Sequence, residues 1–216
     1  VASNITYTVT GTDDNSCSNT AAVIINAVSK PTPLSGGTIT VGSGGTYSTF
    51  TATGGLFSAL NTYGLAGDLI VNVISDITTE TGAVALGAFV SCGGPFTITI
   101  QPDAATLRTV SGNYYNTGVT KGLFAFLGAS NVIIDGSFGT TNRYLTFSNT
   151  NGIAPNAAFS FESDANNITV KYCNITGVVI NNTQQSGEGY SSTGSPAYIF
   201  IGNGSVTGNF NITIDH

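Results

Sequence analysis

The chain has 216 residues, of which 41% are apolar and only 7% are charged, and 28 are glycine. This much apolar content excludes a disordered polar chain, while the shortage of charge leaves solubility to Thr, Ser, Asn and Gly, which suit strands and turns better than helix surfaces. The net charge of −6 and only five basic residues, scattered along the chain, argue against a nucleic-acid partner, which needs clustered Lys and Arg. No apolar run reaches the roughly 20 residues that span a bilayer, so we expect no membrane insertion.

Residues 1–29 contain two runs of alternating apolar and polar side chains, at 5–10 and 21–28. A polar stretch separates the runs, and the pattern predicts a β-hairpin, which cannot fold alone. Asp13 and Asp14 lie in the polar stretch and allow two interpretations. They offer hard oxygen ligands for Ca²⁺, or they form a polar hairpin tip, which is the simpler explanation. No other metal or cofactor is expected.

Residues 30–38 are rich in Pro, Ser and Gly and predict a linker between the hairpin and a large domain at 39–216. Early in this domain, apolar residues at 56–60 and a following Gly64 predict one short helix that ends at the glycine. Two predicted strands come next, at 69–74 and 96–100.

The second half of the chain carries an imperfect internal repeat. Motifs led by Asn, with aliphatic residues at alternate positions, match position by position at 131–135, 167–171 and 211–215. An alternating aromatic motif precedes each of them, at 124–126, 159–161 and 198–200. Two motifs that recur in the same order, with loops of unequal length between them, predict an all-β solenoid. One turn cannot bury its own apolar face, so successive turns must stack.

Alternation within the repeat assigns the faces of its strands. The aliphatic positions, including Val132, Ile168 and Ile212, should be superposed and point inward, with the leading Asn residues in a ladder near a corner. In the aromatic motif the same test places Ser160 and Glu162 outside. The aromatic residues should then form two buried columns, namely Phe126, Phe161 and Phe200 in one, and Phe124, Phe159 and Tyr198 in the other.

Four segments carry a resemblance to a known family: Tyr-Ser-Thr-Phe at 47–50, the expected helix at 56–60, Gly-Asp-Leu-Ile-Val at 67–71 and Asn-Val-Ile-Ile-Asp-Gly at 131–136. They resemble the right-handed parallel β-helix modules of secreted Bacteroidota proteins, which follow immunoglobulin-like repeats in giant cell-surface adhesins, including those of gliding bacteria. The hairpin resembles the last two strands of such a repeat. The resemblance implies a right-handed β-helix with the short helix as its N-terminal cap, export by the type IX route and extracellular display at the cell surface. We also expect the chain to be a piece of a longer protein, with the β-helix truncated at its C-terminal end.

Aligning the repeats brings Asp135, Lys171 and Asp215 into one column on consecutive turns. One interpretation is the groove of a polysaccharide lyase or hydrolase, in which the Asp pair acts as acid and base. The other is an outward ladder of alternating charge, in which each neighbour contact contributes about a few tenths of a kcal/mol. An active groove normally shows more carboxylates or an Arg, so we expect the ladder and no catalytic residues.

The three cysteines are Cys17, Cys92 and Cys173, so at least one has no partner within this chain. Their spacing fits no zinc pattern, and His216 is the only histidine. The immunoglobulin-like resemblance places the partner of Cys17 in strands upstream of the hairpin. We therefore expect Cys17 to pair with nothing in this chain.

Three functions remain open: a surface adhesin or filament segment, a carbohydrate-binding module and a glycan-cleaving enzyme. We expect the first, without catalysis, with a surface polysaccharide or another extracellular ligand and the neighbouring domains of the same long chain as its partners. A carbohydrate-binding module would show an exposed aromatic platform, for which Tyr114, Tyr115 and Tyr190 are the candidates. The Thr-x-Thr runs, such as 38–40 and 97–99, do not recur at the spacing of the repeat and do not predict a flat ice-binding face.

Overall fold

The computed structural model describes residues 5–25, 32–115, 121–152, 157–177, 199–202 and 208–215. The chain divides into two compact units, Val1–Thr32 and Pro33–His216. The smaller unit holds one antiparallel pair of strands, and the larger unit holds the parallel sheets.

The smaller unit contains strands β1 (Ile5–Thr12) and β2 (Ser18–Ile25), which pair antiparallel. Tyr7 is paired with Val23, so their side chains lie on one face together with Val9. All three are exposed. This unit therefore contains no core of its own among the described residues.

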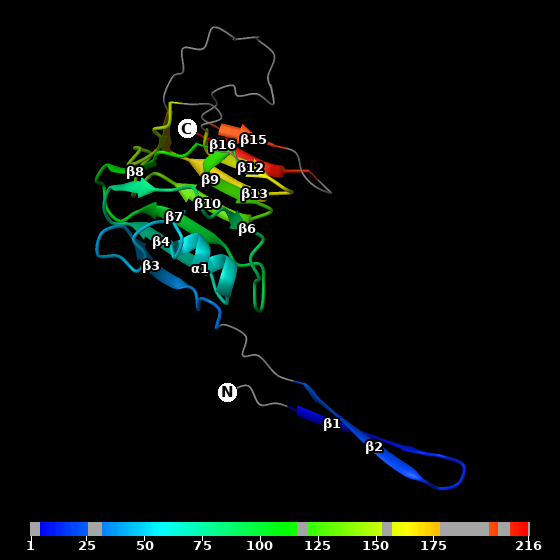
Figure 1. Cartoon of the computed structure of the whole chain (residues 1–216). Coiled ribbons are helices and arrows are strands. Elements are labelled where there is room, and N and C mark those ends of the chain that lie inside the picture. The colour runs from blue at the N-terminus through cyan, green and yellow to red at the C-terminus, as the bar shows by residue number, and fades with distance from the viewer. Residues whose placement is uncertain are drawn as a thin grey trace, which may run out of the picture. The chain divides into compact units, whose positions relative to one another are not determined.

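The larger unit is a parallel β-solenoid built from three sheets (Figure 1). The first, called the long sheet below, consists from edge to edge of β16 (Phe210–Asp215), β13 (Asn166–Lys171), β10 (Ser130–Asp135), β7 (Ile98–Pro102), β4 (Leu69–Val73) and β3 (Gly37–Val41). The second consists of β14 (Cys173–Gly177), β11 (Leu145–Asn149), β8 (Arg108–Gly112) and β5 (Ile77–Glu80). The third consists of β15 (Ile199–Ile201), β12 (Ala157–Glu162), β9 (Gly122–Leu127) and β6 (Leu86–Gly87). From β4 onward each sheet takes every third strand, so the predicted stacking of parallel turns is confirmed.

The register of the long sheet follows the predicted alignment of the Asn-led motifs. Val132 is paired with Ile168, and Ile168 with Ile212. Val132 and Ile168 are 0% exposed, and Ile134 and Val170 are 1% exposed. The aliphatic positions therefore face the interior, as the alternation predicts.

Four aromatic rings of the third sheet stack in the core as predicted. Phe124 is paired with Phe159 and Phe126 with Phe161, with ring centroids 5.6 and 5.4 Å apart. Each of the four side chains is at most 1% exposed. Phe147 of β11 packs against Phe159 with its centroid 4.9 Å away, so the rings join two sheets.

The predicted continuation of these columns into the last turn is wrong by one residue. Phe200 is paired with Ser160, while Ile199 follows Phe159 and Ile201 follows Phe161. Residues 198–201 are apolar at both parities, so alternation alone does not fix their register. Tyr198, which was assigned to the second column, lies outside the described residues.

The expectation that Ser160 and Glu162 face water is also wrong. Their side chains point away from the aromatic rings, yet Ser160 is 0% and Glu162 is 9% exposed. The Ser160 hydroxyl accepts a hydrogen bond from the Gly122 N–H at 3.1 Å, and the Glu162 carboxylate accepts one from the Lys121 N–H at 3.0 Å. These bonds satisfy polar groups that burial would otherwise leave without partners.

Helix α1 (Leu56–Tyr63) packs its apolar side chains into the same core (Figure 1). Leu56, Phe57 and Leu60 are 0% exposed, and the Phe57 ring lies edge-on to Phe126 with centroids 5.9 Å apart. The helix ends at Gly64, whose φ of +74° favours glycine. In Figure 1 the helix and β3 lie at one end of the solenoid, and β15 and β16 lie at the other.

Candidate functional site

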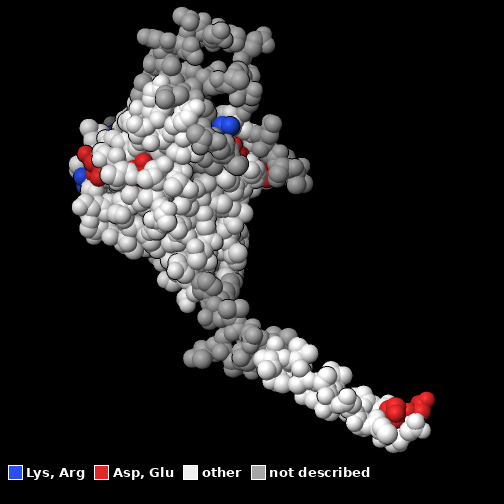
Figure 2. All heavy atoms as spheres, viewed as in Figure 1, with Lys and Arg blue, Asp and Glu red and all other residues white. Residues whose placement is uncertain are grey.

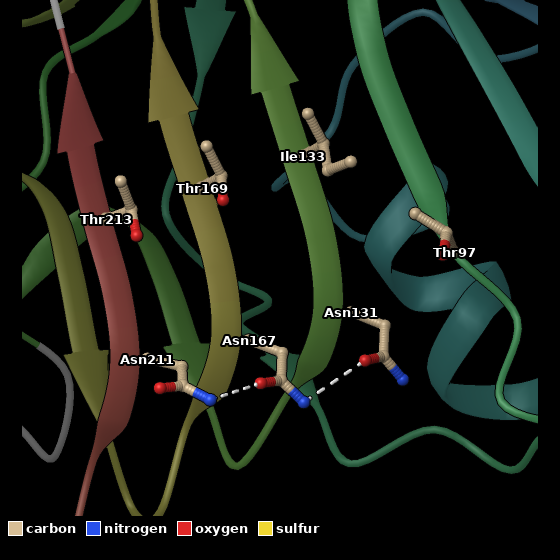
Figure 3. Close-up of a pocket in the computed structure, with 7 residues that line it drawn as sticks. All are labelled: Thr97, Asn131, Ile133, Asn167, Thr169, Asn211 and Thr213. Carbon is tan, nitrogen blue, oxygen red and sulfur yellow. Dashed lines mark hydrogen bonds between the residues drawn. The ribbon is translucent and has the colours of Figure 1, made fainter.

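A ladder of three Asn side chains marks one corner of the long sheet (Figure 3). Asn211 Nδ2 donates to Asn167 Oδ1 at 2.9 Å, and Asn167 Nδ2 donates to Asn131 Oδ1 at 3.4 Å. All three residues have φ between +51° and +57°, a left-handed conformation that Asn tolerates better than most residues. The predicted Asn ladder is therefore present, because each Asn turns the corner that starts its strand.

The ladder borders a hollow of about 370 Å³ on the outer face of the long sheet. Figure 3 shows its lining, which extends from the residue before β7 over β10, β13 and β16 and consists of Thr97, Asn131, Ile133, Asn167, Thr169, Asn211 and Thr213. The lining offers amide and hydroxyl groups that donate and accept hydrogen bonds, beside one aliphatic side chain. Among the described residues that line it there is no carboxylate, amine or imidazole.

The outer face of the long sheet has a central column of side chains that the spacing of the Thr-x-Thr runs did not predict. Pairing along the long sheet aligns four threonines with two isoleucines, in the order Thr38, Ile70, Thr99, Ile133, Thr169 and Thr213. One residue of each run, Thr38 and Thr99, lies in this column, but Thr40 is aligned with Asn72 and Gln101, so the runs themselves do not recur in register, as expected. The two isoleucines interrupt the threonines, so the face is not an unbroken hydroxyl array.

The charge column lies on the same face, one outward position further along the strands. Asp135 is paired with Lys171 and Lys171 with Asp215, as the repeat alignment predicts. Lys171 Nζ lies 3.0 Å from Asp135 Oδ2, and the Ser137 hydroxyl donates to Asp135 Oδ1 at 2.7 Å. Burial acts to raise the pKa of Asp135, but the bonds from Ser137 and Lys171 outweigh it and hold this pKa below its ordinary value.

This arrangement suits a structural ladder better than catalysis. A general acid in glycoside cleavage needs a raised pKa so that it carries a proton at neutral pH, whereas the pKa of Asp135 is lowered. The cation of Lys171 lies on the strand between the two aspartates, where its ion pair neutralises Asp135. On the face drawn in Figure 2, charged side chains are sparse among the described residues.

The other candidate ligands and platforms are used by the fold. Asp13 Oδ1 accepts hydrogen bonds from the N–H groups of Asn15 at 2.9 Å and Cys17 at 2.8 Å, so it stabilises the hairpin turn that it shares with Asp14. Within the described ranges, no three His, Cys, Asp or Glu residues are grouped so that they could hold a metal.

Of the three tyrosines expected to form a platform, the two that the structure describes, Tyr114 and Tyr115, do not line the hollow. Tyr114 packs against the core and lies so close to Gly82 that a Cβ there would come within 2.4 Å of its ring. Tyr115 is 43% exposed, and Tyr190 lies outside the described residues. No aromatic side chain is found among the described residues that line the hollow.

A buried carboxylate that the sequence did not reveal holds the segment before α1. Glu80, only 2% exposed, accepts hydrogen bonds from the N–H groups of Phe50 and Thr51, both at 2.7 Å, and from the Thr51 hydroxyl at 2.5 Å. Burial raises the pKa of Glu80 despite these three donors. Glu80 lies about thirty positions from Phe50 and Thr51 in the chain, and no local sequence pattern predicts such a contact.

The cysteines differ in their exposure to solvent. Cys17 is exposed in the hairpin and Cys173 is buried in the solenoid, and neither forms a disulfide within the described part of the chain. Burial raises the pKa of the Cys173 thiol to about 12, which leaves it protonated and unreactive at neutral pH. The pairing of Cys17 with an upstream partner stays a prediction.

A search with this chain found no match among protein-family models, curated proteins or solved structures. Among the described residues, no helix has the length and apolar character needed to cross a membrane.

Proposed function

We propose that this chain is a non-catalytic module of an extracellular cell-surface protein that binds neutral polysaccharide on the outer face of its long sheet. The observation that carries the proposal is the hollow, in which amide and hydroxyl groups recur from turn to turn beside the Asn ladder. Adhesion through this face suits a module that contains few ionisable groups.

The spacing of the turns supports a polymer as the ligand. Neighbouring strands lie ~4.8 Å apart, so like groups recur along the solenoid at about the length of one sugar ring in an extended chain. Thr169 and Thr213 occupy consecutive turns, as do Asn167 and Asn211. Each sugar could then exchange hydrogen bonds with one amide and one hydroxyl, while Ile133 packs against the C–H groups of a ring.

The finer fold assignment belongs to the same proposal. Connections between parallel strands of one sheet are right-handed in nearly all proteins, which supports a right-handed β-helix. The buried side of α1, at the end of the solenoid where β3 lies, supports its role as a cap. The exposed apolar face of β1 and β2 supports their origin in an immunoglobulin-like repeat, because such a pair needs further strands to bury that face.

Binding to the hollow is tested by affinity electrophoresis in gels that contain neutral polysaccharides, such as β-glucan, xylan or mannan, with alginate and pectin as charged comparisons. Thr169→Val keeps the shape of the side chain but removes its hydroxyl, and should weaken binding to a neutral polymer by about threefold to tenfold. Thr109→Val makes the same change on β8, outside the hollow, and should leave binding unchanged. Absence of binding to every neutral polymer, or equal loss in both variants, would contradict the proposal.

A further inference from the structure

The outer edge of β16 ends the long sheet, and its inward positions are left uncovered. Ile168 and Val170 of β13 are 0% and 1% exposed, whereas Ile214, paired with Val170, is 45% exposed. The third sheet shows the same change, because Phe161 is 0% exposed and Ile201, paired with it, is 53% exposed. Two apolar columns, buried from β4 to β13 in the long sheet and from β6 to β12 in the third sheet, thus emerge at this end.

The Asn ladder gives this edge a direction. In each described step, the amide nitrogen of the later turn donates to the amide oxygen of the preceding turn. Asn211 uses Nδ2 in this way, and Figure 3 shows its Oδ1 directed away from Asn167, toward the free side of β16. This oxygen is placed to accept a hydrogen bond from an Asn side chain on one further strand.

We infer that the free edge of β16 is a docking site for a parallel β-strand of an adjoining solenoid turn, with a leading Asn and aliphatic residues at alternate positions. The docked strand would continue the pairing that already joins each turn of the solenoid to the next. Its Asn would donate to Asn211 Oδ1, and its aliphatic side chains would cover Ile212 and Ile214. Main-chain hydrogen bonds along the edge supply affinity, and the Asn fixes the register.

The geometry favours such a strand over a second copy of this chain. A two-fold pairing of β16 with its own copy would run antiparallel and place Asn211 opposite the far end of the strand, where the ladder cannot continue. A head-to-tail pairing would need the outer edge of β3, where the Tyr47 N–H already donates to the Thr40 carbonyl at 3.2 Å. The β16 edge thus fits an added turn and not self-association.

The docking site is tested with a fluorescein-labelled peptide that has the sequence of residues 164–172 and contains one Asn-led motif. Binding to the purified full chain is measured by fluorescence anisotropy. A second peptide has Gly in place of its leading Asn, the equivalent of Asn167→Gly, which permits the same positive φ but removes the amide. We expect this peptide to bind about threefold to tenfold more weakly, and a scrambled peptide not to bind.

The protein side of the contact is tested with two matched variants. Ile214→Lys places a charge at the docking edge and should weaken peptide binding more than tenfold. Ile70→Lys makes the same change at a position on β4 that is 40% exposed, close to the 45% of Ile214, and should bind the peptide like the wild type. Thermal unfolding checks that both variants fold. If Ile214→Lys does not fold, the comparison of the three peptides on the wild-type chain still tests the inference.

Three results would overturn the inference: no binding of the Asn-led peptide, binding of the Gly or the scrambled peptide as tight as that of the Asn-led peptide, or self-association of the protein that Ile214→Lys abolishes. Self-association is measured by sedimentation velocity at the same protein concentrations. None of these results bears on polysaccharide binding, because the hollow does not include Ile214.

Discussion

Replacement of Phe159 by Ala should destabilise the aromatic core more than the same change at Phe161, two residues along the same strand. Its ring contacts four others, with centroids 4.9 Å from Phe147, 5.6 Å from Phe124, and 6.4 Å from both Phe126 and Phe161. Phe161 contacts only Phe126 and Phe159 among the described rings. Both side chains are 0% exposed, so the transfer and cavity contributions are similar, and the number of ring partners decides the order.

The magnitudes follow from these contacts. Removing a buried Phe costs about 3–5 kcal/mol, and two additional ring pairs at ~0.5–1.5 kcal/mol each place Phe159→Ala near the top of that range and Phe161→Ala near the bottom. Ile201→Ala, in the same column but at a 53% exposed position, should cost less than about 1 kcal/mol and serves as the control.

Urea denaturation measures this order. With a slope of about 2 kcal/mol per M, the unfolding midpoint should fall by roughly 2–2.5 M in Phe159→Ala and roughly 1.5 M in Phe161→Ala. The chain contains nine Tyr and no Trp, so tyrosine fluorescence and far-UV circular dichroism can be followed together to test two-state behaviour. A larger loss in Phe161→Ala than in Phe159→Ala would refute the argument from ring contacts.

Four other changes test the remaining polar contacts. Glu80→Gln places an amide nitrogen opposite a backbone donor and should lower the free energy of unfolding by about 1–3 kcal/mol. Burial raises the pKa of Glu80 above its ordinary 4.5, so the folded state holds this proton more tightly than the unfolded state does. The difference in free energy of unfolding between the wild type and the variant should therefore be largest below pH 4.5 and shrink as the pH rises through the folded pKa. A difference that grows with pH in urea titrations would contradict this. Lys171→Met should lower the free energy of unfolding by about 0.5–1 kcal/mol at neutral pH, measured by thermal unfolding. Since the pKa of Asp135 is lowered, this difference should disappear as the pH falls through that pKa. Asn167→Ala should be about 1–2 kcal/mol less stable than Asn167→Gly, because only Gly adopts the positive φ without strain, and equal urea midpoints would refute this explanation. The purified chain should release no unsaturated or reducing ends from pectin or alginate, and release that Asp135→Asn abolishes would show the charge column to be catalytic.

The sequence by itself determined the register of the Asn-led strands and the charge column. A polar Asn at the corner, with aliphatic side chains on one parity and Thr, Lys or Asp on the other, permits one alignment, because a slip by one residue would bury Lys171. The pairing of the aromatic residues of β9 and β12 is likewise predicted by their alternate positions in the two motifs. These features are local and periodic, so they can be recognised without knowing how the turns stack.

Only the tertiary structure decided which residues meet where the pattern is ambiguous or the contact is distant. Phe200 pairs with Ser160 because residues 198–201 are apolar on both parities, and their register is then set by the neighbouring strand. Glu80 reaches Phe50 and Thr51 from about thirty positions away. The hollow likewise combines strands separated by unequal loops, and loop length hides from the sequence which outward side chains share a column.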